Sequence, residues 1–270
     1  MPHFFSCIVQ THRIHMLEKF ITECHNNILS KEPTEAIDYL YSRGISDKSI
    51  STHKIGYCYE DQIIPEEINY YGKETNSAIS ETGGYSYVIN GRIILPIYGE
   101  FGDLVGFATR RPTHDKGNSW WNLPHPFKKG SHLYLMNLAR KNIFDKNKVY
   151  VMEGYIDAII AYQNGLTNVV ALMGTALTSR KIGLIIRYTN NICLALDIDE
   201  NQSGQKATKK SVFILNQFDF SDSISIIEDI PVGEDPASFL LKNSLEDYLS
   251  KERKLSDKEI LNICKEMVNK

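Results

Sequence analysis

Acidic residues follow two of the apolar runs in the second half of the chain. Glu153 comes directly after the run Val149–Met152, and Asp197 and Asp199 come after the run Asn191–Leu196. If both runs are strands of one parallel sheet, their carboxyl ends meet at the edge where such sheets bind ligands. Alternate residues of an extended segment point to the same side, so the two aspartates offer oxygen ligands to a hard cation, and Mg²⁺ is the natural ion.

Two further acids extend this set. Asp157 follows Glu153 by four residues on a predicted helix and so projects from the same face, and Asp235 lies in the turn 231–236 after the next apolar run. The short segments that carry the five acids contain no Lys or Arg. A bound cation would therefore explain how the five carboxylates stay ionised together. The alternative is that each acid separately ends a strand and caps a helix.

The elements that must position these acids form a regular alternation from Lys148 onward. The apolar runs are 149–152, 168–173, 191–196 and 223–230, and the helical stretches are 155–164, 179–188 and 205–218. This alternation predicts an α/β fold with a mostly parallel, Rossmann-like sheet. The tail from Leu245 to Lys270 has apolar residues at roughly helical spacing, and we expect it to cap the fold or to bind a partner.

The first half of the chain has a different character. Helices are expected at 16–29 and 34–42, and an irregular loop at 70–86. The runs 92–97 and 104–110, joined by Tyr98–Gly102, predict an antiparallel hairpin and hence a mixed α+β subdomain. We therefore expect a helical lead-in (1–30), a basic subdomain (31–145), the parallel α/β domain (146–240) and a short helical tail (241–270).

Composition excludes several classes of protein. Of the 270 residues, 23% are charged and 42% hydrophobic, and no run approaches the roughly 18 apolar residues of a membrane helix. The start of the chain lacks the pattern of a secretory signal, so we expect a cytoplasmic protein with no membrane partner. The five cysteines form no C-x-x-C pair, which argues against a zinc ribbon, and Cys193 is expected to be an inert buried thiol.

Charge is unevenly distributed along the chain. Residues 91–150 hold 10 Lys/Arg against 4 Asp/Glu, a balance of +6, whereas 1–90 hold 7 against 12 and 151–270 hold 13 against 17. A basic segment beside an acidic one is typical of a protein that binds phosphates and also binds divalent cations. The alternative is an ordinary solvated surface.

Several motifs, in order along the chain, resemble those of a known family. The acids Glu153–Asp157, Asp197–Asp199 and Gly233–Pro236 resemble the three acidic motifs of the Toprim domain shared by primases and topoisomerases. Six further segments resemble primase motifs: 39–46, 92–97, 105–110, 122–124, 127–134 and 173–178. The chain thus resembles the RNA-polymerase core of bacterial DnaG-type primases and their phage, plasmid or mobile-element relatives.

The resemblance implies a DNA primase, an enzyme that joins nucleoside triphosphates into short RNA primers on a single-stranded DNA template during replication. The implied catalytic residues are Glu153, Asp197 and Asp199. The implied ligands of Mg²⁺ or Mn²⁺ are these three together with Asp157 and Asp235. The implied contacts to template or nucleotide are Arg43, Arg110, Trp120, Trp121, Asn122, Lys129 and Tyr155. For the adjacent tryptophans, the alternative is that at least one packs into the core.

Four departures qualify the resemblance. The zinc ribbon and the helicase-binding domain of the family are missing, so a replicative helicase or a separately encoded zinc-binding partner is expected to supply them. The family's last acid is Ala237 here, and one expected lysine is Trp120. These departures leave an alternative open, namely a non-catalytic Toprim-type factor of a phage or mobile element that binds single-stranded DNA. A Toprim nuclease is disfavoured by the primase-like segments upstream.

Overall fold

The computed structural model describes residues 2–66, 68, 86–114, 119–123, 128–174, 176–197, 203–218, 220, 223–231 and 233–268, with main chain only at 2–13, 86, 87 and 203. The chain divides into two compact units, one formed by 1–98 with 102–128 and one by 99–101 with 129–270. This division lies earlier in the sequence than the expected boundary at 145. Each unit is described by itself.

The first unit begins with helices and ends with a small sheet. The helices are α1 (Pro2–Leu29), α2 (Thr34–Ser42), α3 (Asp47–Thr52) and α6 (Ser86–Ile89), and the strands are β1 (Gly56–Cys58), β2 (Arg92–Tyr98), β3 (Leu104–Arg110) and β4 (Trp121–Asn122). The Ser46 side chain caps α3 by accepting a hydrogen bond from the Ser49 N–H. Of the loop expected at 70–86, only Ser86 is described, and it begins α6.

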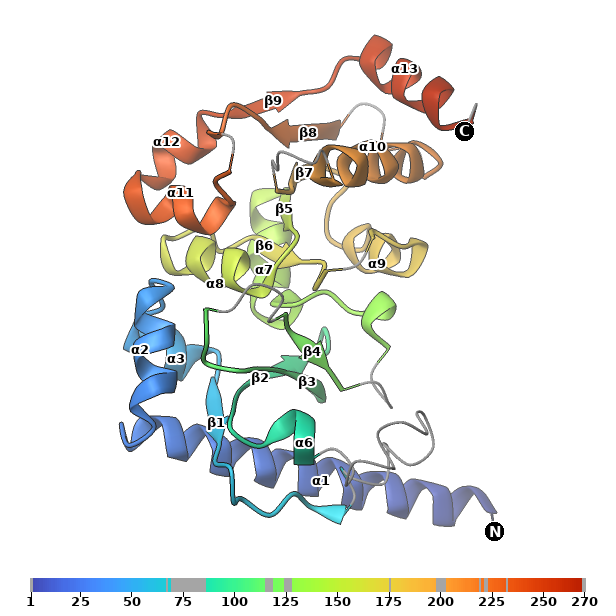
Figure 1. Ribbon diagram of the computed structural model, residues 1–270. Helices are drawn as coiled ribbons and strands as arrows, with labels where there is room; N and C mark the ends of the chain where they lie inside the picture. Colours follow the sequence, from blue (N-terminus) through green and yellow to red (C-terminus); the bar gives the residue numbers. More distant parts are fainter. Residues whose placement is uncertain are drawn as a thin grey trace. The chain divides into compact units, whose positions relative to one another are not determined.

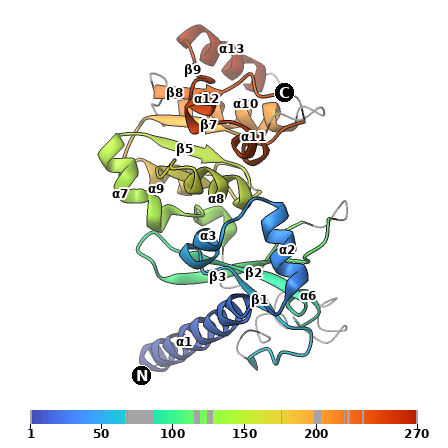
Figure 2. The ribbon, with the colours of Figure 1, turned by 90° about the vertical axis from the view of Figure 1, so that its left-hand side faces the viewer.

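The sheet of the first unit is antiparallel throughout, in the order β1-β2-β3-β4. The expected hairpin is confirmed as the β2–β3 pair, with Ile94 opposite Thr109 and a bulge at Ile97/Tyr98. Apolar residues of α1, among them Phe20 and Cys24, form a buried cluster with one face of this sheet. Figure 2 shows α1 along that side and α2 and α3 on the other side.

The second unit contains a five-stranded sheet in the order β6-β5-β7-β8-β9. The strands are β5 (Val149–Met152), β6 (Val169–Ala171), β7 (Ile192–Ala195), β8 (Ile224–Ile227) and β9 (Glu252–Lys254). The helices are η1 (Lys129–Ser131), α7 (Met136–Lys146), α8 (Tyr155–Gln163), α9 (Ser179–Ile185), α10 (Ser203–Asn216), α11 (Pro236–Lys242), α12 (Leu245–Leu249) and α13 (Asp257–Val268). Strands β5 to β8 are parallel to one another, which confirms the predicted α/β fold.

Helices cover both faces of this sheet. The buried cluster around Val149, Val151 and Leu194 includes apolar residues of α7, α9, α10 and α13. Successive residues of a strand point to opposite faces, so Tyr150 and Cys193 belong to the other face. In Figure 1 helices α8, α11 and α12 lie on one side of the strands, and α9, α10 and α13 on the other.

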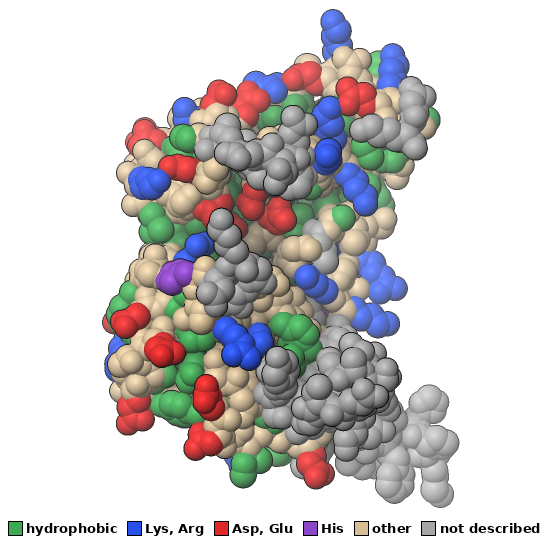
Figure 3. Space-filling model, viewed as in Figure 1, with side chains coloured by type: hydrophobic (Ala, Val, Ile, Leu, Met, Phe, Trp, Pro, Cys, Tyr) green, Lys and Arg blue, Asp and Glu red, His purple; other side chains and the backbone are tan. Residues whose placement is uncertain are grey.

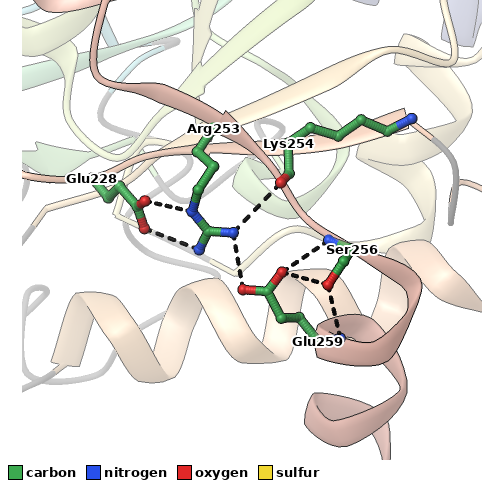
Figure 4. A network of polar contacts seen from close by, with 5 residues as sticks. All are labelled: Glu228, Arg253, Lys254, Ser256 and Glu259. Carbon is green, nitrogen blue, oxygen red and sulfur yellow. Dashed lines mark hydrogen bonds and ion pairs between the residues drawn. The ribbon is translucent and has the colours of Figure 1, made fainter.

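The expectation of a wholly helical tail is wrong in one respect, because β9 adds a strand between α12 and α13. β9 pairs antiparallel with β8. Figure 4 shows that Arg253 of β9 lies between Glu228 and Glu259: its Nη2 donates to Glu228 at 3.0 Å and its Nη1 to Glu259 at 2.9 Å. The tail is thus a structural part of the sheet.

Membrane-spanning helices were searched for in the described part of the chain. None there has the length and apolar character needed to cross a bilayer.

Candidate metal and nucleotide site

The order of the strands creates a switch point between β5 and β7. From β5 the chain crosses through α8 to β6 on one side, and it then returns through α9 to β7 on the other side. Right-handed crossovers in opposite directions place α8 and α9 on opposite faces, which leaves a crevice at the carboxyl ends of β5 and β7. Ligands of open α/β sheets bind in this crevice.

Two predicted acids lie at this crevice. Met152 of β5 pairs with Ala195 of β7, and Glu153 and Asp197 follow these two strand ends. Both side chains are half-buried. Asp197 also borders a cavity of about 510 Å³ beside α10 and β8. Figure 3 shows Asp and Glu side chains gathered where the end of β5 meets α8 and α11.

The backbone of Asp197 is held by close packing against the start of α10. A Cβ atom added to Gly204 would lie 1.7 Å from the Asp197 carbonyl oxygen, which is far inside van der Waals contact. A glycine is therefore required where α10 passes the end of β7.

Asp157 lies in the first turn of α8 and contacts the first turn of α11. It is the third residue of α8, and its Oδ1 accepts a hydrogen bond from the Ala237 N–H of α11 at 3.2 Å. The side chain is buried. A carboxylate is favourable here because both helix N-termini carry partial positive charge. A Cβ at Gly154 would lie 2.5 Å from Asp157 Oδ2, so this position also favours glycine.

Asp235 is the N-cap of α11. Its Oδ1 accepts from the Ser238 N–H at 2.7 Å, and the Ser238 hydroxyl accepts from the Asp235 N–H at 3.0 Å, which forms a capping box. Asp235 therefore caps a helix, as the alternative explanation of the acids proposes for each of them. The second carboxylate oxygen is not used by the capping bond.

The five predicted ligands offer carboxylate oxygen only, which fits Mg²⁺ or Mn²⁺ rather than a soft metal. Asp199 lies outside the described residues. Among the residues that are described, no three His, Cys, Asp or Glu side chains are grouped closely enough to hold one ion. Glu153 and Asp197 are the two predicted ligands that follow the paired ends of β5 and β7.

Two lysines approach the turn after β6. Lys129 of η1 has its Nζ 3.7 Å from the position of a Cβ at Gly174, and Lys181 of α9 donates from Nζ to the Leu172 carbonyl at 2.7 Å. Burial lowers the pKa of Lys129, and burial together with the charge of Lys129 lowers the pKa of Lys181 to about 7. The Gly174 N–H donates to the Glu153 carbonyl at 3.1 Å, so this turn lies beside the crevice. Lys181 was not predicted from the sequence.

Two tyrosines near the acids are buried. Tyr155, predicted to contact nucleotide, is 2% exposed and packs edge to face against Tyr134 at 4.9 Å, which leaves almost no surface for a ligand. Tyr248 of α12 is fully buried, and its hydroxyl has no hydrogen-bond partner in the described part of the chain. Burial raises the pKa of Tyr248, and Asp157 and Asp197 raise it further. Both acids are therefore close enough for their charge to act on this hydroxyl.

In the first unit, Arg110 lies at the end of β3. Its guanidinium carbon is 5.4 Å from the ring centre of Tyr39 on α2, and the Tyr39 ring lies 5.2 Å from His114. The buried Arg110 Nε has no hydrogen-bond partner among the described residues. Arg43, also predicted, is the C-cap of the same helix α2. Tyr39 and His114 were not predicted as neighbours of Arg110.

The tryptophans and Asn122 lie near this strand. Trp121 and Asn122 form β4 and pair with Thr109 and Ala108 of β3. Trp121 is half-buried and packs against the buried cluster of the first unit, which agrees with the alternative that at least one tryptophan packs into the core. Trp120 is half-buried. It remains the better candidate for stacking on a base.

Comparisons with known proteins agree with this architecture. A family model described as the N-terminal domain of the DNA primase catalytic core matches residues 24–140, and a Toprim-like model matches residues 150–240. The DNA primase of Campylobacter jejuni is 33% identical over 228 residues, covering 79% of this chain and 36% of the relative. The chain thus spans little more than a third of the length of that relative.

Solved structures show the same fold. The Aquifex aeolicus primase, with its zinc-binding and RNA polymerase domains, matches with a TM-score of 0.70 and 25% identity over 90% of this chain and 61% of that one. A DnaG primase catalytic domain bound to single-stranded DNA matches with a TM-score of 0.73 and 22% identity, covering 94% of this chain and 84% of that one.

The second unit, with acids at the switch point of a parallel sheet, is a Toprim domain. The whole chain belongs to the DnaG-type primases, because the N-terminal domain of their catalytic core precedes the Toprim domain in the order typical of that family. Toprim primases depend on divalent metal ions.

Proposed function

We propose that this chain is a DNA primase core that synthesises short RNA primers from nucleoside triphosphates on single-stranded DNA. The observation that carries the proposal is the placement of Glu153 and Asp197 at the ends of β5 and β7, which flank the switch point. Similarity to DNA primases over most of this chain supports nucleotidyl transfer as the class of reaction.

In the proposed mechanism Asp197 and Asp199 are the central ligands of Mg²⁺ or Mn²⁺, and Asp235 and Asp157 support them. When bound, the metal lowers the pKa of the attacking 3′-hydroxyl and stabilises charge on the phosphoryl oxygens. Glu153 either ligates or accepts the proton of that hydroxyl. The Asp157 side chain is oriented by the Ala237 N–H and therefore does not have to be ordered during the reaction.

Cationic residues are proposed to hold the polyanions. Arg110 lies at the end of β3 with its guanidinium over the Tyr39 ring, and Lys129 lies beside the turn that contacts Glu153. Arg43, Trp120 and Asn122 are proposed to contact the template strand; a DnaG catalytic domain with this fold was solved with single-stranded DNA. A replicative helicase or a zinc-binding partner is proposed to direct initiation in the cytoplasm.

Primer synthesis from labelled nucleoside triphosphates on mixed single-stranded templates tests the proposal, with Mg²⁺, with Mn²⁺ and with a chelator. We expect metal-dependent primers from the parent and a loss of about 100-fold or more for Asp197→Asn, since even outer-shell partners of metals cost 10- to 100-fold. Asp145→Asn is the matched control, because Asp145 is an exposed acid paired with Lys141 on α7.

The outcomes separate the proposal from the non-catalytic alternative. Template binding without primers under every metal condition would identify a DNA-binding factor. Full activity of Asp197→Asn would remove the metal assignment. Unfolding of Asp197→Asn but not of Asp145→Asn would give Asp197 a structural role.

A further inference from the structure

The cavity of about 510 Å³ that Asp197 borders has a lining of its own. Side chains of α10, α13, β8 and β9 form its walls, and all four elements belong to the second unit. Cavities that hold small-molecule ligands have volumes of about 300–1,000 Å³. The cavity also lies at the carboxyl ends of β7 and β8, the edge where parallel sheets bind ligands.

Part of the wall is apolar. Ile226 of β8 and Leu255, which follows β9, line the cavity from the sheet, and Ile263 lines it from α13. Leu255 belongs to the buried cluster of this unit, and the two isoleucines pack against that cluster. This wall can bind the hydrocarbon part of a ligand, because removing apolar surface from water is favourable.

The basic side chains of the lining are already paired with acids. Arg253 donates to Glu228 at 3.0 Å and to Glu259 at 2.9 Å, as Figure 4 shows. Lys209 of α10 donates to Glu266 at 2.6 Å. The described lining holds these two bases against four acids, a balance of −2; the acids are Asp197, Glu228, Asp229 and Glu259. The charge of the cavity therefore disfavours phosphates and other anions and favours a cation.

Asp229 is the acid of the lining that can pair with such a cation. It follows Glu228 at the end of β8, its side chain is exposed, and it forms no hydrogen bond or ion pair in the described part of the chain. Its φ of 60° is uncommon for a residue with a side chain, although Asp and Asn tolerate it best. Backbone conformations of this kind cluster at ligand-binding sites.

We propose that this cavity binds a small organic cation, an amine whose apolar body lies against Ile226, Leu255 and Ile263 and whose ammonium group pairs with Asp229. The binding site follows from the shape and charge of the cavity and goes beyond the proposed function. Its effect on catalysis rests on the proposed function.

Asp197 connects the cavity to the metal site. It borders the cavity, and its carbonyl packs against Gly204 at the start of α10, the helix that supplies Thr208 and Lys209 to the wall. An ammonium group in the cavity and a divalent cation at Asp197 repel each other, so each should weaken the binding of the other. The amine should therefore lower primer synthesis, and added Mg²⁺ should relieve the inhibition.

The experiment is NMR of the full chain with labelled isoleucine methyl groups, titrated with 4-phenylbutylamine, 4-phenylbutanol and 4-phenylbutyrate at pH 7. These probes share one apolar body and differ in charge. We expect the amine to shift the signals of Ile226 and Ile263 but not that of Ile94 in the first unit. It should bind about fivefold or more tightly than the carboxylate, because the lining is negative.

Asp229→Asn removes the paired charge and keeps a residue type that tolerates the same backbone conformation. It should weaken binding of the amine about two- to fivefold, the range for an exposed ion pair, and leave binding of the alcohol unchanged. Asp145→Asn, which removes an exposed acid of α7, is the matched control and should leave both unchanged.

The absence of shifts at Ile226 and Ile263 with every probe overturns the site. Equal affinities for the amine and the carboxylate overturn the cation assignment, and unchanged amine binding by Asp229→Asn overturns the pairing with Asp229. Amine binding by a chain that makes no primers sustains the site and rejects the proposed polymerase activity. Primer synthesis by a chain that does not bind the amine does the reverse.

Discussion

At the scale of single residues, two glycines test how tightly the backbone positions the acids. Gly204 approaches the Asp197 carbonyl so closely that Gly204→Ala must move the end of β7 or the start of α10. We expect primer synthesis to fall about tenfold or more, because small misplacements of reacting groups cost up to about 100-fold. Initial rates at saturating nucleotide measure the effect.

Gly183→Ala provides the matched comparison. Gly183 lies inside α9, and an added Cβ there meets nothing within 4 Å. Alanine should stabilise the helix by about 0.5–1 kcal/mol and leave activity unchanged. Equal activity of the two variants would show that the position of Asp197 does not limit catalysis.

Tyr248 carries a second residue-scale prediction. Its buried hydroxyl lacks a hydrogen-bond partner among the described residues, and such a group costs about 1–3 kcal/mol. Tyr248→Phe should therefore raise the free energy of unfolding by about 1 kcal/mol. Tyr150→Phe should lower it, because the Tyr150 hydroxyl donates to Glu252 at 2.8 Å. Denaturant unfolding followed by circular dichroism decides, and a loss of stability in both variants contradicts the prediction.

Residue types predicted the acids better than the cations. Glu153 and Asp197 follow apolar runs that form neighbouring strands, so their place at the crevice was accessible from sequence. The burial of Lys181 was not, because a lysine in a helical stretch normally predicts a solvated face. The start of its helix is instead covered by η1, whose Gly130 carbonyl accepts from Thr178 across 48 residues of sequence. Tyr155 shows the converse, since nothing local distinguishes a buried tyrosine from a ligand contact.

At the scale of elements, the C-terminal end of α3 carries a buried histidine whose protonation should destabilise the folded state at acid pH. His53 is the buried C-cap of α3, and burial lowers its pKa to about 4. The native state therefore favours neutral His53, and this contribution is present above pH 6.5 and is lost as the pH falls towards 4. Between pH 7 and pH 5 the loss should be about 2 kcal/mol.

The test compares His53→Gln with the parent and with His114→Gln, an exposed histidine. Both tryptophans of the chain, Trp120 and Trp121, belong to the first unit, so their fluorescence follows the unfolding of that unit. We expect His53→Gln to reduce the difference in unfolding free energy between pH 7 and pH 5. An unchanged difference would place the acid sensitivity elsewhere.

Elements with a clear period were predicted well, and the tail shows why one was missed. The strand 149–152 and the helix 34–42 have the predicted bounds. β9 consists of Glu252, Arg253 and Lys254, whose charges do not suggest a strand. It forms because the exposed backbone edge of β8 accepts a partner, and charged residues suit an edge strand. Sheet edges are a tertiary property that a local pattern does not contain.

At the scale of the whole molecule, the charges that are uneven along the sequence are also distributed unevenly between the two units. The acids belong to the second unit, and the predicted cations occur in both: Arg43 and Arg110 in the first, Lys129 in the second. Composition predicted both signs of charge without predicting which cations are buried. Burial of Arg110 Nε and Lys181 follows from contacts between elements far apart in sequence.

The salt dependence of DNA binding tests whether each unit contributes a phosphate contact. Each contact to single-stranded DNA contributes about 0.7 to the slope of log affinity against log salt. Arg110→Ala and Lys129→Ala should each reduce the slope by about 0.7, and the double variant by about 1.4, because each contact releases its own counterion. Lys210→Ala, which removes an exposed lysine of α10, should leave the slope unchanged. Binding of a labelled oligonucleotide from 50 to 300 mM salt measures all four variants, with circular dichroism to confirm folding. A double variant whose slope equals that of one single variant would mean that only one unit contacts the strand.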